Sequence, residues 1–100
     1  MNRTIFSKIE PQLLDLQNRI FVSDRQNKKY YVLIDNKRVY FGDSRYGQYR
    51  DRTPIKKYSK KDHHDENRRR LYYARHGKTL NDALSKNEIT SVVLSSFFLW

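Results

Sequence analysis

The sequence predicts a small single domain of the α+β class, in which a β-hairpin packs with a central charged helix, an N-terminal amphipathic helix and an apolar C-terminal segment. Three observations support this prediction. The chain has 100 residues, which is the size of one small domain. Two runs of β-branched and aromatic residues flank a group of turn-forming residues. Three further stretches show the apolar or charged spacing of helices.

Near the N-terminus, four apolar residues recur at steps of four, three and four, which predicts an amphipathic helix over about residues 9–20. They are Ile9, Leu13, Leu16 and Ile20. Pro11 falls in the first turn, where its missing N–H is tolerated. The apolar face is expected to cover the core, and the alternative is that it binds a partner. We assign residues 1–28 to an N-terminal helical extension and residues 29–100 to the core of the domain.

A β-hairpin is predicted over residues 29–34 and 38–41, joined by the turn-forming residues 35–37. Alternation along the strands places one set of apolar side chains on the buried face. This set is Tyr30, Val32, Ile34, Val39 and Phe41. The preceding residues 21–27 are polar and are expected to form a connector. Because a hairpin alone is only marginally stable in water, the helices must pack on it.

Residues 42–52 are polar, rich in Tyr and Arg, and interrupted by Gly42 and Gly47, so they are expected to form a loop that presents side chains. They are not a phosphate-binding P-loop, because the Lys-Ser or Lys-Thr that follows the second glycine in that motif is missing. Backbone turns explain the two glycines better. Thr53-Pro54 then interrupts any regular structure.

The central charged helix is predicted over residues 62–77. Ser59 or Asp62 can cap its first turn by accepting a hydrogen bond from an unpaired amide. Gly77 is expected to end the helix in the left-handed conformation. Residues 81–86 would then form a short helical turn of their own.

Two ion pairs are expected along this helix, because each acid precedes an arginine by four residues. Asp65 would pair with Arg69, and Glu66 with Arg70. A neighbouring face of the helix carries Arg68, Leu71, Tyr72 and Arg75. The sequence leaves open whether this face packs inward or points to the solvent.

The C-terminal segment, residues 92–100, is apolar and is expected to close the core over the hairpin. Its spacing favours a helix that begins at Thr90 or Ser91, although its β-branched content leaves a strand possible.

The strong positive charge of the chain points to an acidic partner. Lys and Arg number 21 against 11 Asp and Glu, which gives a net charge of +10. Thirteen basic and five acidic residues fall between positions 37 and 75, so most of the excess lies there. Nucleic acid is the first candidate partner, since arginine with tyrosine suits contacts to phosphate and base. The candidate contact residues are Arg45, Tyr46, Tyr49, Arg50, Arg52, Lys56, Lys57, Arg68 and Arg75.

No catalytic residue, metal site or cofactor is assigned. The chain has no cysteine, which excludes disulfides and a thiolate zinc site. A weaker alternative is a metal-dependent nuclease that uses Asp62, His63, His64 and Glu66. The N-terminus lacks the long apolar run of a signal peptide, and no stretch approaches the ~20 apolar residues that span a bilayer. We therefore expect no membrane partner and no secretion by a signal peptide.

Residues 29–100 carry a pattern that resembles a family of small uncharacterised proteins, which are encoded by large DNA viruses of algae and amoebae and by some tailed phages. The matching positions are Tyr40-Phe41-Gly42-Asp43, Tyr46, Tyr49, Asp51, Tyr58, Asp62-His63, Asp65, Arg68-Arg69, Tyr72, Arg75-His76, Ser95 and Leu99-Trp100. The resemblance implies a viral source and no particular biochemical role. We expect a protein of the virion and the infected cell interior, and the alternative to nucleic-acid binding is a minor capsid or cement protein that bridges viral coat proteins.

Overall fold

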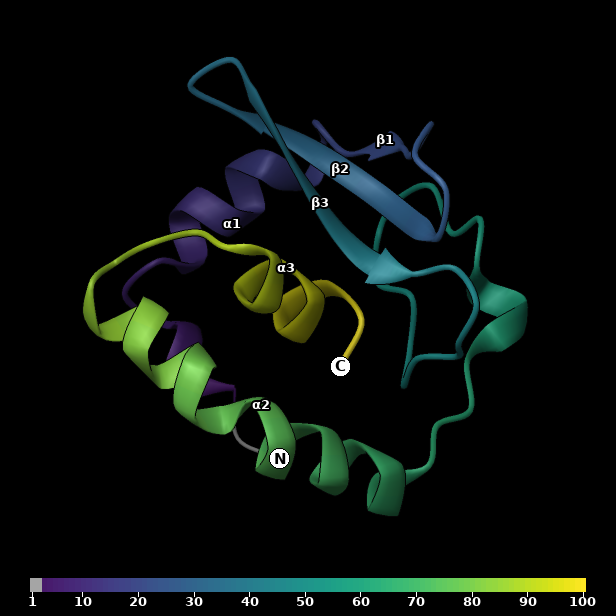
Figure 1. Cartoon of the computed structure of the whole chain (residues 1–100). Helices are drawn as coiled ribbons and strands as arrows, with labels where there is room; N and C mark the ends of the chain where they lie inside the picture. Colours follow the sequence, from purple (N-terminus) through teal and green to yellow (C-terminus); the bar gives the residue numbers. More distant parts are fainter. Residues whose placement is uncertain (1–2) are drawn as a thin grey trace.

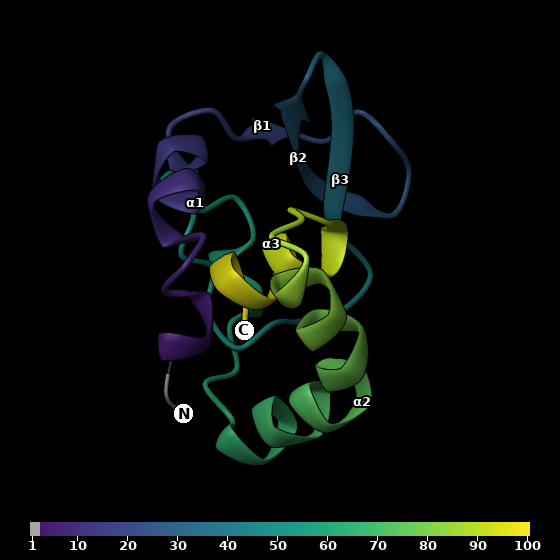
Figure 2. The same ribbon diagram turned by 90° about the vertical axis from the view of Figure 1, so that its left-hand side faces the viewer.

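The computed structural model describes residues 3–100 and confirms the α+β class (Figure 1). The helices are α1 (Glu10–Gln17), α2 (Glu66–Ser85) and α3 (Ser91–Phe98), with short 3-10 turns η1 (Thr4–Phe6) and η2 (Ser59–Lys61); the strands are β1 (Phe21–Val22), β2 (Lys28–Ile34) and β3 (Lys37–Asp43). Figures 1 and 2 place α3 between the sheet and α2. Helix α1 lies beside α3, on a side that neither the sheet nor α2 occupies.

The predicted hairpin is confirmed, with slightly longer strands. β2 and β3 pair antiparallel, with Tyr30 opposite Phe41 and Val32 opposite Val39. Asp35 and Asn36 form the two-residue turn with φ values of 51° and 65°, and this left-handed geometry matches the twist of a hairpin. The connector predicted over residues 21–27 is wrong in part, because β1 adds a third antiparallel strand beside β2. A strand of two residues is too short to show alternation.

The expected buried faces meet in one core. Tyr30 and Val32 of β2 and Phe41 of β3 are almost fully buried, and they pack with apolar residues of α3. The four residues of the N-terminal apolar stripe are buried in the same core, so this face covers the core as expected. The described part of residues 1–28, which the sequence places as an extension, therefore packs into the core of residues 29–100. α1 is shorter than expected, since its helical turns span Glu10–Gln17.

The C-terminal segment is helical, as its spacing favours. Thr90 caps α3, and its Oγ1 accepts a hydrogen bond from the N–H of Val93 at 3.4 Å. Five residues of α3 are buried, and the helix packs on both β3 and α2.

Both predicted ends of the central helix are wrong. α2 begins at Glu66, because Asp65 is its cap: Asp65 Oδ1 accepts hydrogen bonds from the N–H groups of Asn67 and Arg68 at 2.9 and 3.2 Å. The helix also passes through Gly77 and ends at Ser85. Asn87 supplies the stop instead: it has a φ of 54°, and its N–H donates to the carbonyl of Leu84.

The helix continues past Gly77 because two residues beyond it, Leu80 and Ala83, are buried in the core. Leu80 and Ala83 are 1 % and 6 % exposed, and their burial holds the last turns in helical form. A glycine in a helix interior costs only about 1 kcal/mol relative to alanine, which this packing offsets.

Replacing Gly77 with alanine should therefore stabilise the protein by about 0.5–1 kcal/mol, since the added methyl group restricts the unfolded chain. A Cβ at this position would meet no atom within 4 Å. Urea unfolding measures the change. Gly42→Ala is the matched contrast and should destabilise, because Gly42 has a φ of +80° and its Cβ would lie 2.8 Å from Leu99 Cδ1. A loss of stability in Gly77→Ala would contradict this account.

Candidate nucleic-acid interface

A buried polar network holds the loop between β3 and α2 in place. Asp51 is 1 % exposed and lies at the centre of this network. Its Oδ2 accepts from the hydroxyl of Tyr30 at 2.5 Å and from the N–H of Tyr58 at 3.3 Å. Its Oδ1 accepts from the N–H and the hydroxyl of Thr53 at 3.0 and 2.6 Å. The carboxylate thus joins a core strand to two residues, Thr53 and Tyr58, of a segment that lacks regular structure.

Gln48 forms a second part of the same network. Its backbone pairs with the segment just before α2, since the Gln48 N–H donates to Lys61 O and its carbonyl accepts from the His63 N–H. Its side-chain amide donates to Asp62 Oδ1 and to the carbonyl of Tyr58. Asp62 Oδ1 also accepts from the N–H of Asp51 at 2.8 Å. Asp62 is therefore engaged in holding the loop and does not cap α2.

Lys29 is buried at the edge of this network. Its ammonium donates to Gln48 Oε1, and the residue is 1 % exposed. The pKa of Lys29 is lowered to about 8, chiefly by burial and also by the nearby charge of Lys61, while the carboxylates of Asp43, Asp51 and Asp62 oppose the shift. A lysine is among the least common residues in a protein core because its charge loses hydration there.

The lowered pKa of Lys29 predicts that stability rises between pH 8 and pH 10. In that range the unfolded chain keeps the proton, with a pKa of 10.5, while the folded protein releases it. Below pH 8 the buried charge therefore lowers the free energy of unfolding. As the pH rises and the charge is lost, the free energy of unfolding should increase by on the order of 1–3 kcal/mol. Urea unfolding at pH 8 and pH 10 should show this gain in the wild type and in Lys57→Met, but not in Lys29→Met. An equal gain in Lys29→Met would contradict the assignment.

A groove opens where α2, α3 and the end of β3 meet. Arg68, Leu71 and Arg75 of α2 line it on one side and are exposed. The sequence left the direction of this helix face open, and the structure turns it to the solvent. Tyr72 is buried beneath it, stacked on Trp100 with ring centroids 4.5 Å apart and an interplanar angle of 6°. The stacked pair forms a rigid apolar floor below the two arginines.

Tyr46 reaches the groove from the loop after β3. It is 63 % exposed and lines the opening, so it is the tyrosine with the most surface available for contact with a base or sugar. Arg45, its neighbour, is exposed but already engaged: its Nε and Nη2 lie 3.0 and 2.8 Å from the carboxylate of Asp43. This bidentate contact lowers the pKa of Asp43 to about 2, and it neutralises a carboxylate that lines the groove.

The remaining candidate residues lie outside this groove. Tyr49 and Arg52 turn toward the other side of α2, where the Tyr49 hydroxyl donates to Glu66 Oε1 at 2.6 Å. Arg50, Lys56 and Lys57 are exposed on the loop. Of the nine candidates, the structure thus brings Tyr46, Arg68 and Arg75 together.

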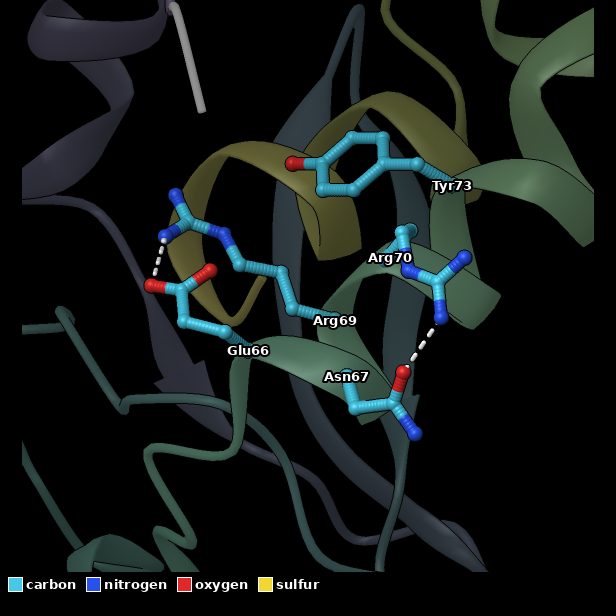
Figure 3. A pocket seen from close by; sticks show the side chains of 5 residues that line it. All are labelled: Glu66, Asn67, Arg69, Arg70 and Tyr73. Carbon is cyan, nitrogen blue, oxygen red and sulfur yellow. Dashed lines mark hydrogen bonds and ion pairs between the residues drawn. The ribbon is translucent and has the colours of Figure 1, made fainter.

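Neither expected ion pair of α2 is the contact that the structure shows (Figure 3). Arg69 lies 3.4 Å from Glu66, three residues before it, and Arg70 donates to Asn67 Oδ1. Asp65 is the cap residue immediately before the first turn, and its carboxylate accepts from the otherwise unpaired amides of that turn. A spacing of four residues permits an ion pair, but the carboxylate of Asp65 is already engaged in capping the helix.

The groove also contains residues that were not among the nine candidate contacts. Lys28 begins β2 and adds an exposed positive charge, and His76 and Trp100 are also part of the lining. The position of Lys28 at a strand end gave no signal, because the predicted hairpin began one residue later. Trp100, the single tryptophan of the chain, was visible in the sequence as part of an apolar tail.

The carboxylates and histidines of residues 62–66 do not converge. Among residues 3–100, no group of three His, Cys, Asp or Glu side chains could hold a metal ion. Asp62 accepts hydrogen bonds in the loop network, and His63 Nδ1 accepts from the N–H of Asp65 at 3.0 Å. Nothing in this arrangement favours the nuclease alternative.

No protein-family model, curated protein or solved structure matches the chain. Within the described residues, none of the helices has the length and apolar character needed to cross a bilayer.

Proposed function

We propose that this chain is a small, non-enzymatic basic viral protein, associated with the virion, that holds nucleic acid in the groove between α2 and β3. The observation that carries the proposal is the meeting of Lys28, Arg68 and Arg75 at one opening that also exposes Tyr46. Among residues 3–100, Asp43 is the one carboxylate that lines that opening, and it is bound to Arg45. Within residues 3–100, Arg68 and Arg75 form no ion pair with a carboxylate, and Lys28 acts on Asp43 only through its charge, so these three cations are available to a phosphate backbone.

The rigid floor of the groove supports the same function. Tyr72 and Trp100 are fixed by their mutual stacking, and Tyr72 also shares a hydrogen bond with the hydroxyl of Ser96 at 3.0 Å. Because Tyr72 lies on α2 between Arg68 and Arg75, its fixed contacts hold this part of the helix in place. Binding would therefore require little further ordering of the backbone that carries the two arginines.

The alternative is a minor capsid or cement protein, and one observation favours it. The outer side of the sheet exposes Phe21 and Leu33, each 45 % exposed, and Phe21 stacks there on Tyr31. Apolar residues gathered on one face are a feature of protein contacts. The apolar stripe of α1 does not contribute, since it is buried in the core.

Salt dependence tests the proposal. A labelled duplex or single-stranded oligonucleotide is titrated with the protein between 50 and 200 mM salt, with anisotropy and Trp100 fluorescence as readouts. Three phosphate contacts predict a slope of roughly −2.7 in log affinity against log salt for duplex DNA. A flat response, with no change in the fluorescence of Trp100, would reject nucleic-acid binding in this groove and favour the coat-protein alternative.

A further inference from the structure

A second cluster of arginines lies on the other side of α2 from the groove. Arg52 and Arg69 both make cation–π contacts with the ring of Tyr49, and their guanidinium carbons lie 5.9 and 4.3 Å from its centroid. Arg3 joins them from the N-terminal segment. It donates to the carbonyl of Phe97, while the N–H of Arg52 donates to the next carbonyl, Phe98 O, at 2.9 Å. Chain segments far apart in sequence thus bring three guanidinium groups together.

These arginines are unusual because they are withdrawn from water. The side chain of Arg69 is 9 % exposed, and Arg3 and Arg52 are half-buried. Burial lowers the pKa of Arg52 to about 10, and the charges of Arg3 and Arg69 add to the effect. Burial likewise lowers the pKa of Arg3. Arginine holds its proton more firmly than any other side chain, so such shifts report a strongly unfavourable place for positive charge.

The cluster has too little negative charge of its own. Glu66 touches Arg69 at 3.4 Å, but its carboxylate is 66 % exposed and also accepts from the Tyr49 hydroxyl. Glu10 acts on Arg3 only through its more distant charge. The carbonyl of Phe97 accepts from only one N–H of the Arg3 guanidinium, and the bond from Arg52 to Phe98 O is made by the backbone N–H, so most of the five N–H groups of each guanidinium are not used by these carbonyls.

Three buried donors are consequently left over. Within residues 3–100, Arg3 Nη1, Arg52 Nη1 and Arg69 Nε have no hydrogen-bond partner. Buried donors without partners are rare in folded proteins, and charged ones are the most costly. Arg69 also lines an open groove together with Glu66, Asn67, Arg70 and Tyr73. Figure 3 shows the guanidinium of Arg69 and the hydroxyl of Tyr73 extending to the same side of α2, away from Arg70.

We propose that Arg3, Arg52 and Arg69 form a binding site for a small phosphate-type oxyanion, reached along the face of α2 that carries Arg69 and Tyr73. A tetrahedral oxyanion offers several acceptors to donors from different directions, which suits three arginines whose free N–H groups come from separate segments. Its charge also compensates the buried cations. This site goes beyond the nucleic-acid groove, because it shares no residue with it.

Melting temperatures in buffers of equal ionic strength test the site. Inorganic phosphate should raise the melting temperature of the wild type by roughly 4 °C or more above sodium chloride, since a ligand that binds the folded state stabilises it. Phenyl phosphate distinguishes a free anion from an ester: a shift equal to that of phosphate indicates that the groove beside Arg69 admits the ester group. Equal melting temperatures in phosphate, phenyl phosphate and chloride would overturn the proposal.

Arg52→Gln identifies the site. This variant should lose the phosphate-dependent shift while melting in chloride at or above the wild-type temperature, because one of three crowded charges is removed. Arg50→Gln has the same change in net charge on the same loop and should keep the shift, and Arg68→Gln in the other groove should keep it too. If Arg52→Gln fails to fold, Arg3→Gln replaces it. Equal loss in Arg50→Gln and Arg52→Gln would show general charge screening and overturn the site.

Discussion

Replacing Asp51 with alanine is expected to lower the free energy of unfolding by about 3–4 kcal/mol, which places it among the most damaging single changes in a small domain. Four donors lose their acceptor at once: the Tyr30 hydroxyl, the Tyr58 N–H, and both donors of Thr53. Tyr30 and Thr53 are fully buried, so water cannot replace the carboxylate without opening the core. Leaving buried donors unpaired costs more than the net value of the bonds themselves.

Urea unfolding of Asp51→Ala measures this loss, with Asp15→Ala as the matched control. Asp15 is 66 % exposed, and its Oδ2 lies as far as 3.9 Å from Nη2 of its partner Arg19. Removing this weak, exposed pair should change stability by less than about 0.5 kcal/mol. Similar values for the two variants would show that the Asp51 network does not hold the fold. Asp51→Asn adds a finer test, because its amide retains one oxygen acceptor and should recover part of the loss.

The double variant Arg68→Gln and Arg75→Gln should have the largest effect on nucleic-acid binding. Both side chains are exposed at the groove, so removing them should leave the fold intact. If each contacts one phosphate, the slope against log salt becomes shallower by about 1.8, and affinity at 0.1 M salt falls on the order of 50-fold. The loss should be similar for different sequences, because phosphate contacts do not read bases.

The control for this experiment is Lys8→Gln with Arg19→Gln, which removes the same two charges from exposed positions outside the groove. These changes should lower affinity only through the reduced net charge and leave the slope nearly unchanged. Equal losses in both double variants would locate the attraction in the overall charge, and the groove would then have no special part in binding.

Several features of the fold could be predicted because they depend on neighbours in the sequence. The turn at Asp35 and Asn36 follows from residues that accept a positive φ, and alternation along the strands identified Tyr30, Val32 and Phe41 as buried. The apolar stripe of α1 and the helical C-terminal segment were also visible from spacing alone.

The extent of α2 could not be predicted, because its ends depend on distant contacts. Asp62 and Asp65 are both suitable caps by residue type, and the hydrogen bonds of Asp62 to Gln48 and Asp51 decided between them. Gly77 is an equally reasonable stop, but burial of Leu80 extends the helix beyond it. Local propensity is weak enough for tertiary packing to override it.

For the candidate site, too, some features follow from the sequence and others only from the tertiary structure. The sequence by itself determined the excess of positive charge, its concentration between residues 37 and 75, and the shared helix face of Arg68 and Arg75. Only the tertiary structure decided that this face points to the solvent beside Tyr46, and that Arg52 and Arg69 turn away to meet Arg3. The physical reason is that charge is a property of composition, whereas the burial of a charge depends on which distant segments fold against it.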